Sequence, residues 1–167
     1  IVLITLHSSS AWKAALKMLL NNRTEMTHML LDADCQLPES KMKMTPTSLQ
    51  EVGCRPEFLN AQITYIGDKE FEDAFDAAVI AKALNDDYPR DDGEPWIMEE
   101  IQRMKAESNK FSKVVVDTVR RECKPQRRTN ANKPSIALAV AKRCTSDFIP
   151  IKLQEALEAL RQRAGIH

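Results

Sequence analysis

Glycine is scarce in this chain, which has 4 glycines among 167 residues. None of the 4 belongs to a GxGxxG or P-loop pattern. A loop that cradles nucleotide phosphates needs closely spaced glycines, because its backbone N–H groups must approach the phosphate oxygens. The sequence therefore excludes a glycine-rich nucleotide-binding loop. The acidic stretch 86–94 also lacks the ligand spacing of an EF-hand.

An excess of charge is absent as well, since 24 Lys and Arg balance 24 Asp and Glu. Any binding to nucleic acid must therefore come from local charge segregation or from bridging metal ions. Basic residues do gather in KPQRR, residues 124–128, and at Lys142 and Arg143. No aromatic residues are interleaved with them, so stacking on bases is not predicted.

Long apolar runs and paired cysteines are missing too. No segment approaches the roughly 20 apolar residues that cross a bilayer, and no secretory signal is present. The 4 cysteines show no CxxC pair and no adjacent His, which argues against a zinc site. We expect free thiols in a cytoplasmic protein that has no membrane contact.

The remaining composition is that of a folded domain, with 43% hydrophobic and 29% charged residues. Ile1 lies inside an apolar, β-branched run, so we expect the chain to be a fragment of a longer protein. We predict one domain over residues 1–167, with an α/β core over 1–84 and a helical extension over 85–167.

Alternating strands and helices are predicted in the first half. The apolar runs at 1–6, 27–32 and 62–67 predict strands. A helix is predicted at 11–20 and a short one at 46–53, where Gly53 supplies the stop. Strands that alternate with helices imply right-handed crossovers and a parallel sheet.

Helices are predicted for most of the second half. Val114, Val115 and Val116 could form a strand, but their flanks favour a helix. The predicted helical segments are 69–84, 94–107, 110–123, 133–144 and 150–164.

Two aspartates end the second predicted strand. Asp32 and Asp34 follow an apolar run and lie about 6 to 7 Å apart along an extended backbone. Like charges at this spacing repel unless water or a cation screens them. Parallel α/β sheets bind ligands at the carboxyl ends of their strands. The pair therefore predicts either a solvated strand end or a site for a divalent metal ion.

A second acidic cluster follows the third predicted strand, in the segment GDKEFEDAFD. If the two strands are neighbours, both clusters meet at one edge of the sheet, where carboxylate oxygens suit Mg²⁺ or Mn²⁺. On a helix, Glu72 and Asp76 would share a face, and Glu70 would be a weaker ligand. Acids in a first helical turn are also favourable against the helix dipole without any ligand. The cluster consists of Asp68, Glu70, Glu72, Asp73 and Asp76.

Lys133 stands immediately before the proline that opens a late helix, NKPSIALAVAKR. It is either an exposed lysine at a helix start or a cation that stabilises charge on a reacting phosphate.

Three motifs, taken in order, resemble a known family. They are LLDAD, YIGDKEFEDAF and the late NKPSIALAVAKR followed by DFIPIKLQEALEAL. Together they resemble the Toprim domain of the overcoming-lysogenization-defect (OLD) nucleases, a fold shared with topoisomerases and DnaG-type primases. The resemblance covers most of the chain and implies a Toprim-like, Rossmann-like parallel sheet with flanking helices and a mainly helical C-terminal half.

The resemblance implies a metal-dependent DNA endonuclease or nickase that acts in phage defence and uses two Mg²⁺ or Mn²⁺ ions. Asp32 and Asp34 match the family's DxD. Glu72, with Asp76 one turn on, looks like its acidic helix, and Lys133 looks like its late lysine. The implied catalytic residues are Asp32, Asp34, Glu72 and Lys133. The implied metal ligands are Asp32, Asp34, Glu72, Asp76 and Glu70.

The implied partners are DNA of low sequence specificity, an ATPase domain upstream in the same chain, and a second copy in a homodimer. The family's early motif, a strand followed by Glu-Gly, is absent here. We expect that motif upstream of Ile1, and without it we expect only weak metal binding.

Three alternatives stay open. LLDADCQLPE also resembles the DxD strand of metal-dependent nucleotide-sugar glycosyltransferases. A receiver domain would use Asp34 as phosphoacceptor, but the upstream acidic pair of such domains is missing. The third alternative is a degenerate Toprim domain that serves as a non-catalytic interaction module.

Overall fold

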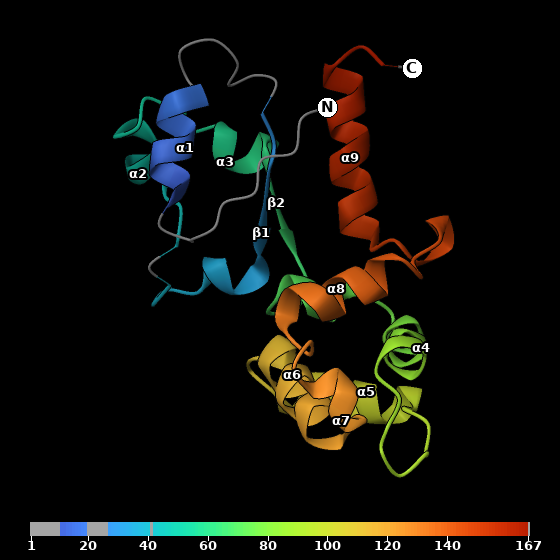
Figure 1. Ribbon diagram of the computed structural model, residues 1–167. Helices are drawn as coiled ribbons and strands as arrows, with labels where there is room; N and C mark the ends of the chain where they lie inside the picture. Colours follow the sequence, from blue (N-terminus) through green and yellow to red (C-terminus); the bar gives the residue numbers. More distant parts are fainter. Residues whose placement is uncertain (1–10, 20–26, 41, 167) are drawn as a thin grey trace. The chain divides into compact units, whose positions relative to one another are not determined.

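The computed structural model describes residues 11–19, 27–40 and 42–166 (Figure 1). The chain divides into two compact units, one made of Ile1–Ile66 with Ile151–His167 and the other of Gly67–Pro150. Each unit has its own cluster of buried apolar side chains. The fold is mixed α/β, with a small parallel sheet in the first unit and helices elsewhere.

Two parallel strands, β1 (Met29–Asp32) and β2 (Ile63–Ile66), form the sheet. Met29 pairs with Ile63 at one end and Asp32 pairs with Ile66 at the other. Both predicted strands in these regions are confirmed, as is their parallel direction. The predicted strand at 1–6 lies outside the described residues.

Helices flank this strand pair within the first unit. Helices α1 (Trp12–Leu19), α2 (Pro46–Gln50) and α3 (Phe58–Ala61) lie on one side of it, while α9 (Ile151–Arg163) lies on the other and packs against β2 (Figure 1). Helix α1 buries Trp12 and Leu16 in the core. A capping box formed by Thr45 and Ser48 starts α2. Gly53, at a φ of 83°, follows α2, so the predicted helices at 11–20 and 46–53 are confirmed.

The second unit is helical. Helix α4 packs against α5 and α8, and α6 packs against α5, α7 and α8. The triple valine 114–116 lies inside α6, as predicted. None of the helices in the described ranges combines the length and the apolar character that a bilayer crossing requires. The α-helices are α4 (Ala77–Asp87), α5 (Met98–Glu107), α6 (Phe111–Glu122), α7 (Pro125–Arg128) and α8 (Lys133–Ala141).

The prediction of one continuous helix over 69–84 is wrong. The segment forms a short 3-10 helix, η4 (Phe71–Ala74), and α4 begins only at Ala77. Phe75 between them has an extended backbone, with φ −76° and ψ 147°. Asp76 is the N-cap of α4, and its carboxylate accepts the N–H of Ala78 at 2.7 Å. Because an N-cap residue lies outside the helix it caps, Glu72 and Asp76 do not share a helical face.

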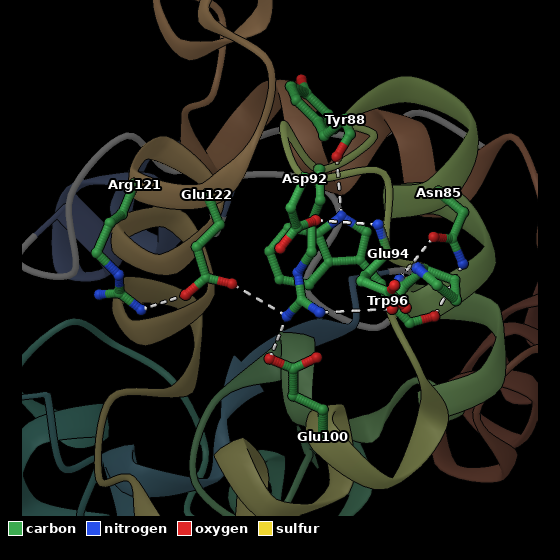
Figure 2. Close-up of polar contacts among 10 residues, drawn as sticks. Asn85, Tyr88, Asp92, Glu94, Trp96, Glu100, Arg121 and Glu122 are labelled. Carbon is green, nitrogen blue, oxygen red and sulfur yellow. Dashed lines mark hydrogen bonds and ion pairs between the residues drawn. The ribbon is translucent and has the colours of Figure 1, made fainter.

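A dense polar network fixes the loop between α4 and α5 (Figure 2). The Trp96 ring is 2% exposed, and its indole N–H donates to the Tyr88 carbonyl at 2.8 Å. The side chain of Asn85 accepts the Trp96 backbone N–H at 2.7 Å and donates to its carbonyl at 2.9 Å. The Arg90 guanidinium lies 4.0 Å from the Trp96 ring centroid and pairs with Glu100. These contacts join groups of the second unit to one another, although the buried Arg90 Nε has no hydrogen-bond partner among the described residues.

Candidate functional site

Asp32 and Asp34 lie at the carboxyl end of β1, where the sequence predicts them. Asp32 is the last residue of the strand, and Asp34 lies in the first turn of the 3-10 helix η3 (Ala33–Gln36). Asp32 keeps an extended backbone, with φ −62° and ψ 143°, so the chain turns directly after the strand. Both side chains are partly exposed, while Leu31 and Cys35 beside them are buried.

The negative charges of Asp32 and Asp34 act on the pKa of the neighbouring Cys35 thiol. Burial, followed by the carboxylates of Asp34 and Asp32, raises the pKa of its thiol to about 11. Burial and the nearby Cys35 also raise the pKa of Tyr65, which lies on β2 opposite Leu31. Thiol and phenol therefore stay protonated at neutral pH, and the ionised groups of this strand end are hard carboxylate oxygens. Such oxygens are the ligands that Mg²⁺ and Mn²⁺ prefer.

The acidic loop 67–76 of the second unit is organised around Asp73. Its carboxylate accepts the backbone N–H groups of Asp68, Lys69 and Glu70, at 2.7, 3.0 and 2.9 Å. Gly67 makes this wrap feasible with a φ of 82°. A Cβ at that position would lie 1.9 Å from the Glu70 carbonyl oxygen and 2.4 Å from Asp73 Oδ1. The Asp73 carboxylate is thus committed to folding its own loop.

Glu70 is 5% exposed and anchors the loop to the start of α6. Its carboxylate accepts the backbone N–H of Ser112 at 2.8 Å and the Ser112 hydroxyl at 3.2 Å. Lys110 adds an ion pair at 3.8 Å. A carboxylate at a helix N-terminus compensates unpaired N–H groups and the helix dipole. The geometry therefore gives Glu70 a structural role.

Lys105 holds the same loop from α5. Its ammonium donates to the carbonyls of Asp73, at 3.0 Å, and Phe75. Burial lowers the pKa of Lys105, and nearby carboxylates partly oppose this effect. Lys69 adds another anchor by donating to the Ser108 carbonyl at 2.7 Å. The loop is therefore fixed to both α5 and α6.

Glu72 and Lys133, predicted as site residues from separate motifs, are in contact. Lys133 Nζ lies 3.0 Å from Glu72 Oε1. Lys133 is the first residue of α8, whose N-cap Asn132 accepts the N–H of Ser135 at 3.0 Å. The Lys133 side chain is 50% exposed, that of Glu72 24%. Glu72 Oε2 is buried and has no hydrogen-bond partner among the described residues. The pair presents an accessible ammonium beside a carboxylate that has one unsatisfied oxygen.

The predicted site residues fall into groups of different character. Asp32 and Asp34 belong to the first unit, and the others belong to the second. Within the second unit, Glu72 and Lys133 come together, while Asp76 caps α4. In the described ranges, no three His, Cys, Asp or Glu side chains are arranged closely enough to hold a metal ion.

Sequence reasoning missed the structural roles of three residues that shape these sites. The N-cap role of Asp76 had a readable signal, because Asp directly before an alanine-rich helix is typical of an N-cap. The roles of Cys35 and Lys105 had none, since both depend on burial and on contacts between separate elements.

Comparisons with known proteins assign no family to the chain. No protein-family model, curated protein or solved structure matches it. A function must therefore be argued from the geometry of the residues and from the resemblance of the motifs.

Proposed function

We propose that the chain is a nuclease domain of Toprim type, with a Rossmann-like core, from an ATPase-linked OLD-type protein. It would hydrolyse phosphodiester bonds of DNA in a metal-dependent reaction. The observation that supports this best is the 3.0 Å contact between Glu72 and Lys133. These residues come from separate motifs, and the resemblance implies that they act together.

The residues of both groups fit the chemistry of a divalent metal. The partly exposed carboxylates of Asp32 and Asp34 and the unsatisfied Oε2 of Glu72 are hard oxygen donors. Bound Mg²⁺ or Mn²⁺ supplies an activated water and stabilises the leaving oxygen. Asp32 and Asp34 would hold one metal ion in the first unit, and Glu72 would be a ligand for another in the second unit. Lys133 would bind the scissile phosphate through its exposed ammonium and stabilise the charge that develops there.

A non-catalytic interaction module is the second candidate, and one observation favours it. Two of the predicted ligands, Glu70 and Asp76, accept backbone N–H groups from helix starts, and Asp73 accepts three more from its own loop. These bonds give the acidic cluster a role in folding that requires no catalytic function.

Metal binding is the first test. Calorimetric titration with Mn²⁺ should show weak binding that the double variant Asp32→Asn, Asp34→Asn abolishes. Glu39→Gln is the matched control, because Glu39 is an exposed acid near the pair in sequence. Binding that survives the double variant would place the metal elsewhere and favour the interaction module.

Plasmid nicking with Mn²⁺ is the second test. We expect Lys133→Gln to lower nicking strongly while leaving Mn²⁺ binding intact. The control is Lys142→Gln, which removes an exposed lysine from the end of the same helix. Nicking that persists in Asp32→Asn would refute the assignment. Transfer from a nucleotide sugar, assayed in parallel, would instead support the glycosyltransferase alternative.

A further inference from the structure

Charge is strongly segregated in the second unit. The segment 120–144 contains eight Lys and Arg but one acid, Glu122, a net charge of +7 in a chain whose total is 0. It covers the last turn of α6, the single turn of α7 and all of α8. A local excess of this size attracts polyanions, but only to the extent that internal ion pairs leave it unneutralised.

Three of the eight cations pair with a carboxylate of another element inside the unit; one of them, Arg128, lies 3.8 Å from Asp91 and stays 43% exposed. Arg143 bonds to Asp86 at 3.0 Å and to Asp87 at 2.8 Å. Lys133 pairs with Glu72 at 3.0 Å. The contacts of Arg143 and Lys133 remove the α8 end of the segment from the main excess.

Apart from Lys142 at the end of α8, the exposed cations that remain gather where α6 ends and α7 begins. Among the described residues, no carboxylate lies within ion-pair distance of Arg120, Lys124 or Arg127. Arg121 must share Glu122 with a second arginine. We call this surface the α6–α7 corner, made of Arg120, Arg121, Lys124, Arg127 and Arg128, all of which are exposed.

Hydrogen bonds hold the corner in place. The backbone N–H of Lys124 donates to the carbonyl of Pro89 at 3.0 Å. Arg120 and Arg128 each donate through Nε to a backbone carbonyl, at 2.6 and 2.9 Å. A carbonyl orients a guanidinium without cancelling its charge, so these arginines are preorganised cations. Basic residues near a helix C-terminus also favour the helix dipole, which applies to Arg120 and Arg121 in α6 and more weakly to Arg127 and Arg128 in the single turn of α7.

The chemistry of the corner fits a phosphate backbone better than a lipid surface. Four of its five cations are arginines, whose planar forks match phosphate oxygens. Interfacial membrane sites combine cations with exposed apolar side chains. Within residues 120–134, all of which the structure describes, no large apolar side chain is exposed.

We propose that the α6–α7 corner binds the sugar-phosphate backbone of duplex DNA without reading its sequence. Phosphate contacts position a protein and carry no sequence information directly. The choice of DNA rests on the proposed nuclease function, whereas the contact with phosphate rests on the five cations alone.

The test measures binding of the full chain to a short fluorescent DNA duplex by anisotropy in the presence of EDTA. The variant carries Arg121→Gln, Lys124→Gln and Arg127→Gln. Loss of three phosphate contacts should weaken binding at low salt by about tenfold or more, and should flatten the slope of log affinity against log salt by about 2 to 3. The charge-conserving control, with Arg121→Lys, Lys124→Arg and Arg127→Lys, keeps every positive charge and should retain the wild-type slope.

A second control removes three exposed lysines outside the corner, with Lys82→Gln, Lys113→Gln and Lys152→Gln. Equal weakening in both triple glutamine variants would show an effect of net charge and overturn the proposal, as would a wild-type chain that binds no duplex. Corner-dependent binding to anionic phosphatidylserine vesicles without duplex binding would overturn it too. EDTA prevents hydrolysis, so the binding assay is independent of nuclease activity. Corner-dependent binding by a chain that does not nick plasmid in the separate Mn²⁺ assay would refute the nuclease alone. Nicking with corner-independent binding would refute the corner alone.

Discussion

The two units use their carboxylates in opposite ways. In the first unit, Asp32 ends β1, Asp34 follows in η3, and both stay partly exposed. Together with burial, which is the larger cause, they raise the pKa of the Cys35 thiol. In the second unit, Asp73 accepts three backbone N–H groups, and Glu70 is bonded to the start of α6. In the second unit, bonds to backbone donors, rather than the number of acids in the motif, decide what Asp73 and Glu70 do.

The acid-dense segment is therefore the less promising source of ligands for the metal ions of the proposed function. The many acidic residues of this segment serve loop folding and helix capping, which need carboxylates at fixed places. Glu72 is the exception, because it faces Lys133 and keeps one buried oxygen without a partner among the described residues.

Gly67→Ala should have the largest effect on the second unit. The new Cβ would lie 1.9 Å from a backbone carbonyl oxygen, and the residue would keep a φ of 82°. The conformation costs about 1–2 kcal/mol, and displacing the loop should bring the loss of unfolding free energy to about 4 kcal/mol. Urea unfolding measures the change.

Gly93→Ala is the matched control for Gly67→Ala. Gly93 has a φ of 84°, but a Cβ there would meet nothing within 4 Å. It should cost only about 1 kcal/mol, which is the conformational part. Equal losses in the two variants would contradict the wrapped loop around Asp73.

Asp73→Ala against Asp34→Ala tests the comparison directly. Removing Asp73 leaves three N–H donors without their charged acceptor, which should cost about 3 kcal/mol. Removing Asp34, which is partly exposed, should cost less, about 1 kcal/mol. Hydrogen exchange should show faster exchange at 68–70 in Asp73→Ala. A larger loss in Asp34→Ala would reverse the roles assigned to the two units.

Local signals were enough to predict much of the fold. The run that became β1 is apolar, and the run that became β2 is rich in β-branched residues. A helix between them ends before Gly53, so strands and crossover could be read from neighbouring residues. The placement of Asp32 at the strand end follows from the same pattern.

Contacts between distant residues were not predictable. Phe71, Phe75 and Ala78 have helical spacing, yet the chain breaks at Phe75 because Asp73 and Asp76 bond to nearby backbone N–H groups. The bond from Ser112 to Glu70 joins elements far apart in the chain, and no local pattern encodes it. The contact between Glu72 and Lys133 could be suggested only by the resemblance of both motifs to one family.

The stability of the first unit should fall in mild acid because of His28. Burial, followed by the charge of Arg163, lowers the pKa of His28, and its ring nitrogen Nε2 is bonded to Thr64 Oγ1 at 2.8 Å. The unfolded chain therefore binds a proton at a higher pH than the folded one. The contribution of His28 to the free energy of unfolding is fully present above the ordinary His pKa of about 6.5. It declines as the pH falls from there through the lower pKa of the folded state.

Urea unfolding of the wild type and of His28→Gln between about pH 5 and 7.5 measures this dependence. The variant should be less stable at neutral pH and should have a shallower slope below about pH 6.5. Thr64→Val removes the hydroxyl partner but keeps the imidazole, so its slope should persist. A wild-type slope that His28→Gln leaves unchanged would assign the acid sensitivity to other groups.

Alkylation of Cys35 should give the smallest effect and the sharpest test of its two neighbouring carboxylates. With a pKa of about 11, Cys35 is almost entirely protonated at pH 8, so iodoacetamide should modify it more slowly than the partly exposed Cys144. Asp34→Asn removes a charge that raises this pKa and should accelerate the reaction.

Mg²⁺ prefers oxygen over sulfur ligands. If it binds Asp32 and Asp34, it should accelerate alkylation in the wild type and have no effect in the double asparagine variant. Mass spectrometry of the peptide that contains Cys35 measures the rate without requiring any catalytic activity. A rate that is insensitive both to Asp34→Asn and to Mg²⁺ would mean that the carboxylates neither govern the thiol nor hold the metal.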